Sequence, residues 1–490
     1  MIFLKRILDH TLFFPLIIAI WGVFSVLFLE HLPANKGLGW DGLRYALIVQ
    51  ELLNAPSIDN YLVLRVFPSA LIHACMDLAS IQPTARNIIT AFNVLNTISL
   101  AISAITLKGV FKHFSFNLRL QLFGFCLIYL NYAVTNFTYY YPVMTDTLCF
   151  SISLLMFYFF IKNQIINLLL VTLIGTFTWP TLMIQGLILF LFPYFRDGAV
   201  RPISERLKRV FSILSISYMS FLILFFILMG DLDTNVYGVP KIDRDLLFTS
   251  ILCLAVLYYF LPQLLFNRDF YSFSQFLSKR FLVSAAIAIG IVISLYFFKD
   301  WLNIYQRASH YYGIKHQLTT SLAFGLVKPS ISLVSHITYF GGSFIIMVIL
   351  WKSFCKEIHS LGLGFALFLF LNLFFYGLKT ESRAILNVFP WISIVCLMMF
   401  QKLNVSNLTL IIIVVFNFIS SKIWLSINYG SGEGGLDQDG AALFPDQFFF
   451  LNFGNRMSEN MWLFQLVVFV LTGFIFYFLL KKHINGKSQE

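Results

Sequence analysis

Charge is scarce in this chain: Asp, Glu, Lys and Arg make up 12% of its 490 residues, whereas a soluble globular protein carries about 25%. Hydrophobic residues make up 59%, and the mean hydropathy is +0.80. This balance excludes a soluble domain of ordinary size. Apolar runs follow one another almost from end to end, and a membrane core of roughly 30 Å is crossed by a helix of about 20 mainly apolar residues. We therefore predict a protein that crosses a membrane many times.

Cysteine and proline are also few. The six cysteines form no close pair, so the sequence indicates neither a zinc motif nor a disulfide framework, and we interpret them as small core residues: Cys75, Cys126, Cys149, Cys253, Cys355 and Cys396. With 14 Pro and 27 Gly against 57 Phe, the apolar segments favour bulky helices over the alternating strands of an outer-membrane barrel. The predicted fold class is all-α, a polytopic transmembrane helical bundle.

No single basic surface is evident, although the formal net charge is +11. Lys and Arg are dispersed among the hydrophobic spans, which argues against a nucleic-acid partner. Lys5 and Arg6 precede the apolar run 11–29, and no small-residue cleavage site follows it, which favours an uncleaved signal anchor. Because Lys and Arg favour the cytoplasmic side, we predict the N-terminus inside and residues 30–85 outside.

The apolar runs predict about 12 to 14 transmembrane helices. When successive loops are assigned to alternate sides of the membrane, the inner side has roughly 20 Lys and Arg and roughly 6 Asp and Glu. The outer side has roughly 14 Lys and Arg and roughly 17 Asp and Glu, and an excess of basic residues inside is expected of a correct topology. Both termini are then cytoplasmic. The outer loops long enough to carry chemistry are 30–85, 231–245, 299–330 and 427–460. Besides 11–29, the spans are placed near residues 86–107, 120–135, 146–161, 164–178, 181–195, 210–230, 246–266, 281–298, 331–351, 361–378, 384–400, 408–426 and 461–480.

The first outer loop contains the stretch DGLRYALIVQELL, in which Leu43, Leu47 and Leu52 recur at helical spacing. This pattern predicts an amphipathic helix that is too polar to span and lies in the outer interface. Asp41 stands at its start, either as a functional carboxylate or simply as an N-cap. A similar stretch follows from Arg65, whose side chain could also merely snorkel.

A second acidic position follows the outer turn NFTYYYPVMT, where Asp146 begins an otherwise uncharged span. A carboxylate at that depth is costly unless it is paired, solvated in a cavity or placed at a helix N-terminus. Taken alone, Asp146 is explained at least as well by capping as by catalysis. Two such acids on one predicted face, Asp41 and Asp146, are harder to attribute to capping.

Basic side chains gather in the outer loop 299–330 and beside the span 384–400. Arg307, His310 and Lys315 are interleaved with aromatic residues, which indicates contact either with anionic lipid or with an anionic ligand. Arg383 lies in KTESRAILNVFPWI, and its planar fork suits a phosphate group. An ion pair with Glu381 is the alternative interpretation.

The acidic loop 427–460 holds Asp437, Asp439 and Asp446, but their spacing does not match a calcium-binding EF-hand. We interpret this loop as a cover over the outer face. No metal site and no cofactor is predicted, with a divalent metal kept as the alternative.

Three short stretches resemble the membrane-embedded GT-C glycosyltransferases. DGLRYALIVQELL, after the first span, is similar to the first-loop segment of the aminoarabinose transferases and their relatives, which carries an essential Asp. The TD of YYPVMTDTLCF is similar to the second acidic position of that superfamily, and ESRAILNVFPWI resembles its late segment with a Glu, an Arg and a Pro. The matching positions are Asp41, Asp146, Glu381, Arg383 and Pro390.

The resemblance implies a GT-C-like catalytic core in residues 1–400, including loop 30–85, followed by C-terminal transmembrane helices in residues 401–490 with loop 427–460. It implies an inverting glycosyltransferase that moves a sugar from a polyprenyl phosphate or diphosphate to a glycan or lipid acceptor. The expected location is the outer face of a bacterial inner membrane, in cell-envelope polysaccharide biosynthesis. The chain departs from the aminoarabinose transferases at Gly42, where they have Glu, and has Ala384 where an aromatic residue follows the Arg.

Residue roles follow from the same resemblance. Asp41 and Asp146 are the predicted catalytic residues, with Asp41 as the base for the acceptor hydroxyl and Asp146 positioning the acceptor or the base. Cations are needed near the departing phosphate. The predicted substrate-binding residues are Arg44, Tyr45, Arg65, Arg307, His310, Lys315, Glu381 and Arg383.

Two other functions stay open. A lipid-linked glycan polymerase or ligase of another membrane fold would use arginines of the outer loops rather than Asp41. A transporter or flippase would place its site near the bilayer midplane. The polar residues within the spans are mostly uncharged, such as Asn93, Gln185 and His336, and no inverted repeat is evident, so transport is the less favoured alternative.

Overall fold

The computed structural model describes residues 10–52, 62–194, 205–228, 245–265, 278–301, 314–425, 427–428, 447–448, 457 and 459–486. These residues are almost all helical, which confirms the predicted all-α fold. Two strands of two residues each, β1 (Ile427–Asn428) and β2 (Gln447–Phe448), pair in parallel. The chain divides into two compact units: unit 1 comprises residues 1–194 and 273–311, and unit 2 comprises residues 195–272 and 312–490. The predicted boundary at residue 400 stays a prediction.

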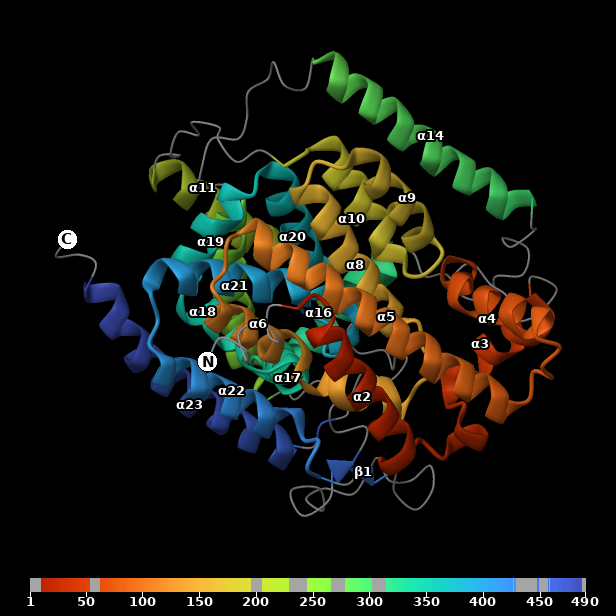
Figure 1. The fold of residues 1–490 in the computed structure, drawn as a ribbon. Helices are drawn as coiled ribbons and strands as arrows, with labels where there is room; N and C mark the ends of the chain where they lie inside the picture. Colours follow the sequence, from red (N-terminus) through yellow and green to blue (C-terminus); the bar gives the residue numbers. More distant parts are fainter. Residues whose placement is uncertain are drawn as a thin grey trace. The chain divides into compact units, whose positions relative to one another are not determined.

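Unit 1 is built around the long helix α5, against which α2 and α8 pack (Figure 1). Four polar residues of α5 point inward, while four of its apolar residues point outward: Asn93, Asn96, Ser99 and Ser103 are exposed by 5% or less, whereas Val94, Ile98, Ile102 and Ile105 are exposed by 41–55%. Exposed apolar side chains beside buried polar ones fit an apolar solvent. The elements of unit 1 are α2 (Phe13–Phe28), η1 (Ala34–Gly37), α3 (Trp40–Glu51), η3 (Val63–Arg65), α4 (Val66–Leu78), α5 (Ala85–His113), α6 (Leu118–Tyr129), the π-helical η4 (Tyr132–Phe137), α7 (Thr138–Tyr140), α8 (Asp146–Ile161), α9 (Ile165–Thr176), α10 (Pro180–Leu191) and α14 (Lys279–Trp301).

Unit 2 contains the remaining helices. The buried helix α21 packs against α18 and α19, and α23 packs against α17, α18 and α22. The elements are α11 (Glu205–Leu228), α12 (Leu247–Phe260), η5 (Leu261–Leu264), α16 (Ile314–Val327), α17 (Ile331–Phe340), α18 (Gly342–Ile349), α19 (Trp351–Ser360), α20 (Leu363–Tyr376), η6 (Ser382–Ile385), α21 (Phe389–Leu403), α22 (Asn407–Ser421) and α23 (Glu459–Gly486).

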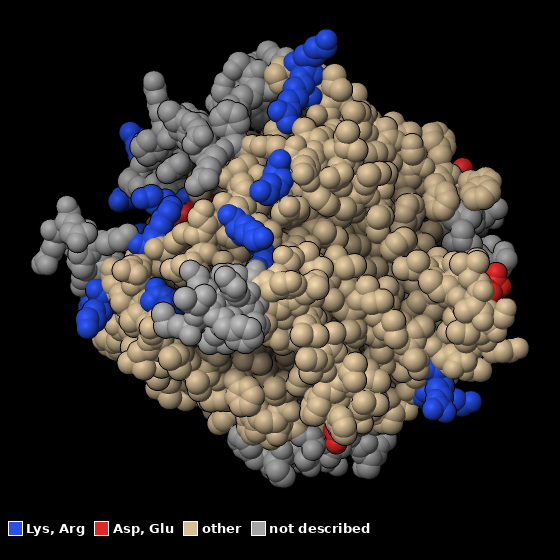
Figure 2. All heavy atoms as spheres, viewed as in Figure 1, with Lys and Arg blue, Asp and Glu red and all other residues tan. Residues whose placement is uncertain are grey.

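Within the part of the chain that the structure describes, four helices are long and apolar enough to cross a membrane: Ala85–His113, Leu247–Leu264, Lys279–Trp301 and Glu459–His483. A fifth span results if Leu118–Tyr129 and Tyr132–Tyr140, bent by 62°, are taken as one. Nine further apolar helices have 10 to 17 residues. Several helices could therefore span a membrane, and the face drawn in Figure 2 is mostly uncharged.

Most predicted spans coincide with helices, but two are broken. The predicted span 331–351 divides into α17 and α18 at Gly341, which has φ +77°. The N–H of Gly342 there donates to Oδ1 of Asn417 at 2.7 Å. The predicted span 120–135 bends between α6 and η4. The breaks leave helices shorter than the runs of apolar residues suggest.

Candidate functional site

The predicted amphipathic helix of the first loop is present as α3, and its buried face includes Tyr45, Ile48 and Val49. Its N-cap residue is Gly39, with no side-chain capping hydrogen bond, so Asp41 lies one residue inside the first turn and does not occupy the cap position. Asp41 is partly buried there. A carboxylate in a first turn is favoured by the helix dipole, which explains its position without assigning it a task.

The segment that precedes Asp146 docks on the chain around α3. Leu32 N–H donates to the carbonyl of Tyr140 at 2.9 Å, and the N–H of Gly42 donates to the hydroxyl of Tyr141 at 3.1 Å. A Cβ at Gly42 would lie 2.8 Å from the carbonyl oxygen of Val143 and 2.9 Å from its Cβ. The close approach of two backbones thus explains glycine at this position, where the aminoarabinose transferases have Glu.

Helix α5 also holds this segment. The side-chain amide of Asn96 donates to the carbonyl of Pro142 at 3.0 Å, and the hydroxyls of Thr97 and Tyr139 lie 3.3 Å apart. Asp146 then begins α8, in its first turn after Thr145, and is only 2% exposed. Polar side chains of α5 therefore fix the turn that precedes the second predicted acid.

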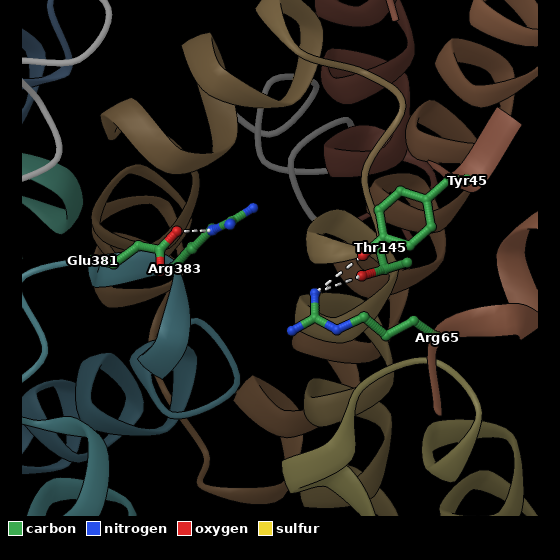
Figure 3. Close-up of polar contacts among 5 residues, drawn as sticks. All are labelled: Tyr45, Arg65, Thr145, Glu381 and Arg383. Carbon is green, nitrogen blue, oxygen red and sulfur yellow. Dashed lines mark hydrogen bonds and ion pairs between the residues drawn. The ribbon is translucent and has the colours of Figure 1, made fainter. Parts of the chain in front are cut away.

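Arg65 connects these parts of unit 1. Its Nη1 donates to the hydroxyl of Tyr45 on α3 at 3.2 Å and to Oγ1 of Thr145, the residue before Asp146, at 3.4 Å (Figure 3). Its guanidinium carbon lies 3.7 Å from the centroid of the Trp179 ring, a cation–π contact that is strengthened by burial. Arg65 is 6% exposed. One buried guanidinium therefore links the helix of Asp41 to the turn of Asp146.

Three charged side chains, those of Asp41, Arg65 and Asp146, affect the pKa of Tyr45. Burial raises the pKa of Tyr45, Arg65 acts to lower it, and the negative charges of Asp41 and Asp146 act to raise it. All three charged side chains thus lie within electrostatic reach of one phenol. The structure brings together Asp41, Tyr45, Arg65 and Asp146, four of the predicted site residues.

The chain has no match among protein-family models, curated proteins or solved structures. The resemblance to GT-C enzymes accordingly depends on the short motifs and stays a prediction.

In unit 2, Nε of Arg383 donates to a carboxylate oxygen of Glu381 at 2.5 Å (Figure 3). The Arg383 side chain is 16% exposed and the Glu381 side chain 38%. The ion pair considered from the sequence is therefore present. Pro390 occupies the first turn of α21, as helix N-termini allow.

Three side chains of α16, α17 and α20 hold the segment that carries this pair. Ser332 Oγ donates to the carbonyl of Leu378 at 2.7 Å, and Ser321 Oγ donates to that of Phe375 at 2.9 Å. Asn387 Nδ2 donates to Oδ1 of Asn372 at 3.3 Å. The Arg383 segment is thus anchored on both flanks.

Four predicted site residues are not assigned to either group. Arg307 and His310 lie outside the described residues, and Lys315 belongs to α16 without a described side chain. Arg44 is partly exposed on α3. Among the described residues, no group of three or more His, Cys, Asp and Glu side chains could hold a metal ion. Trp179 was not predicted as a site residue, although the Trp-Pro pair marks the turn into α10.

Proposed function

We propose that this chain is a membrane glycosyltransferase that moves a sugar from a polyprenyl-linked donor to an acceptor hydroxyl. The observation that carries the proposal is the link through Arg65, which joins the helix of Asp41 to the turn of Asp146 by way of Tyr45 and Thr145. Two short motifs resemble the acidic segments of GT-C enzymes, and they lie far apart in the sequence. A shared site requires these two motifs to lie close together, and the link through Arg65 supports this.

The proposed reaction is a single displacement with inversion at the anomeric carbon. The acceptor oxygen forms a bond to that carbon while the bond from the carbon to the phosphate oxygen breaks, and the electron pair leaves with the polyprenyl phosphate. The acceptor proton passes to the carboxylate of Asp41, as general base. Asp146 holds the acceptor or the base in place.

Cations stabilise the charge that develops on the departing phosphate. For this task the planar guanidinium and the late motif favour Arg383. The predicted contact of Arg65 with substrate stays a prediction, because its described contacts are with Tyr45, Thr145 and Trp179.

A test requires the purified full-length chain, a polyprenyl-phosphate sugar and a panel of acceptors, with product measured by mass spectrometry. Asp41→Asn keeps the side chain's size and its ability to accept a hydrogen bond, so the fold is expected to persist. Loss of a general base lowers kcat by at least about 100-fold. Asp77→Asn, which changes an exposed acid of α4, is the matched control and should keep full activity. Near-normal transfer by Asp41→Asn contradicts the base assignment, and elongation of a repeat unit instead of single transfer indicates a polymerase.

The location is part of the proposal: the inner membrane, with the termini in the cytoplasm and loop 30–85 on the outer face, as the Lys and Arg distribution predicts. Cys75 is the exposed cysteine among the six, all of them free. An impermeant maleimide added to intact cells should label the natural chain, and Cys75→Ser should abolish the labelling. In the Cys75→Ser background, Lys356→Cys should react only after permeabilisation. Labelling of that cysteine in intact cells contradicts the orientation.

A further inference from the structure

Helix α19 has two contrasting faces and is too short to cross a membrane. On one face, Phe354, Cys355 and Ile358 are at most 1% exposed. On the other face, Lys352 and Lys356 are exposed and lie one helical turn apart. A ten-residue helix with this pattern fits an interface in which the lysines remain in water.

The α19 helix is fixed to η5 at both ends. Nε1 of Trp351 donates to Oε1 of Gln263 at 3.2 Å, and Nε2 of His359 donates to the carbonyl of Leu264 at 2.6 Å. The two exposed lysines therefore have a defined position in unit 2.

An ion pair between a buried acid and an exposed lysine joins α19 to the end of α21. Nζ of Lys402 lies 2.7 Å from both carboxylate oxygens of Glu357, which is 3% exposed, while the Lys402 side chain is 58% exposed. The acid is thus covered and neutralised, and it does not offset the positive charge of Lys352 and Lys356 at the surface.

The end of α23 lies at the same end of unit 2. The N–H of Ser406, in the turn between α21 and α22, donates to Nε2 of His483 at 3.4 Å. Lys481 and Lys482, directly before His483, are both exposed. In the described residues of these helix ends, residues 351–360, 398–409 and 477–486, Glu357 is the one acid. We name the set Lys352, Lys356, Lys402, Lys481 and Lys482 the lysine end.

Apolar surface borders the lysine end. Leu408 and Ile411 are 64% and 58% exposed at the start of α22, and Phe478 is 65% exposed one turn before Lys482. Cations next to exposed hydrocarbon match a molecule that has a negative group and an apolar chain side by side. A soluble acidic protein or a nucleic acid would leave the apolar part uncovered.

We propose that the lysine end binds the headgroups of anionic phospholipids, whose acyl chains lie along the exposed faces of α22 and α23. Lysine suits this surface because its ammonium is a compact charge on a flexible stem and needs no fixed fork. The lipid surface is separate from the glycosyl-transfer proposal and stands without it.

The test is native mass spectrometry of the purified full-length chain, titrated in detergent with phosphatidylglycerol and, separately, phosphatidylcholine. Each lysine near an anionic membrane surface contributes about fivefold to affinity. Lys352→Gln combined with Lys356→Gln removes two such contributions and should therefore weaken phosphatidylglycerol binding by roughly 25-fold, and leave phosphatidylcholine binding unchanged. Lys402 is left intact because its loss would strand the buried Glu357.

The matched control removes two cations from unit 1, Lys36→Gln with Arg86→Gln, both exposed in the structure. This variant has the same net charge as the test variant and should bind phosphatidylglycerol like the natural chain. Equal weakening in both variants overturns the proposal, because it indicates net charge alone. Equal binding of the two lipids, or displacement of phosphatidylglycerol by inorganic phosphate, also overturns it. Unchanged monodispersity on gel filtration verifies that both variants are folded.

Discussion

Oγ of Ser382 lies 3.0 Å from Nδ1 of His336, and in the neutral imidazole the hydroxyl donates, because the other ring nitrogen carries the proton. That second nitrogen, Nε2, lies 2.9 Å from the carbonyl oxygen of Gly377, which can only accept. The neutral imidazole therefore bridges two points of the chain on either side of Glu381. Together with Ser332 on the same face of α17, it anchors the segment that carries Arg383.

The anchoring role can be separated from packing by two serines of α17. Ser332→Ala removes a hydrogen bond to the carbonyl of Leu378, and Ser335→Ala removes one to the carbonyl of Ile331 in the same helix. Both residues are buried. A hydrogen bond contributes about 1 kcal/mol, so Ser332→Ala should raise KM for the lipid-linked donor about fivefold, with little change for Ser335→Ala. Steady-state kinetics at saturating acceptor measures this, and equal KM values in both variants argue against the anchor.

A second prediction concerns the guanidinium itself. Arg383→Lys should lower kcat/KM at least tenfold, because charge-assisted hydrogen bonds contribute about 1.5–3 kcal/mol and a point charge does not replace a planar fork. Lys379→Ala, four residues earlier, removes a cation whose Nζ lies 5.3 Å from the Tyr376 ring centroid and should have a small effect. Equal and mild losses in both variants would leave Arg383 as the partner of Glu381 only.

Gly42 provides a third prediction, on the fit of α3 against the turn before Asp146. Gly42→Ala places a methyl group 2.8 Å from the carbonyl oxygen of Val143, and overpacking of this kind costs about 1–3 kcal/mol. We expect a lower melting temperature in detergent and reduced transfer. Gly290→Ala in α14 is the control, since a Cβ there has nothing within 4 Å. An unchanged melting temperature of Gly42→Ala would show that α3 is not packed closely against the turn.

Helix positions could largely be predicted from the sequence, because an uncharged run between polar residues defines its own limits. The predicted span 146–161 is α8, which begins at Asp146 and ends at Ile161, before Lys162. The break between α17 and α18 could not be predicted from the sequence, because it requires a positive φ at Gly341 and a hydrogen bond from Gly342 to Asn417, 75 residues further on. Local hydropathy contains no information on such a partner.

The same distinction applies to the site. Asp41 and Asp146 could be selected from local sequence, because a carboxylate next to an apolar run is unusual. The partners of Arg65 could not be predicted in this way, because Tyr45, Thr145 and Trp179 come from three separate parts of the chain. Snorkelling was one interpretation of Arg65, and the structure instead has it 6% exposed. Burial of a charge depends on tertiary contacts that no periodicity reveals.

The last prediction separates a positioning role of Arg65 from contact with the donor. Arg65→Lys loses the planar stack on Trp179, and Tyr45→Phe loses only the hydroxyl that accepts from Nη1. If Arg65 positions the acids, each change should lower kcat with KM for the donor nearly constant, and the double variant should lose less than the sum of the two free energies, because both act on one interaction. Arg65→Lys combined with Ser332→Ala is the control pair, and its effects should add, because the described hydrogen bonds of Arg65 go to Tyr45 and Thr145, whereas that of Ser332 goes to the carbonyl of Leu378. The measurement is a full set of kcat and KM values for the two cycles, with melting temperatures to exclude unfolded protein. A large rise in KM for the donor in Arg65→Lys, with kcat preserved and additive effects in the Tyr45 cycle, would instead make Arg65 a substrate-binding residue.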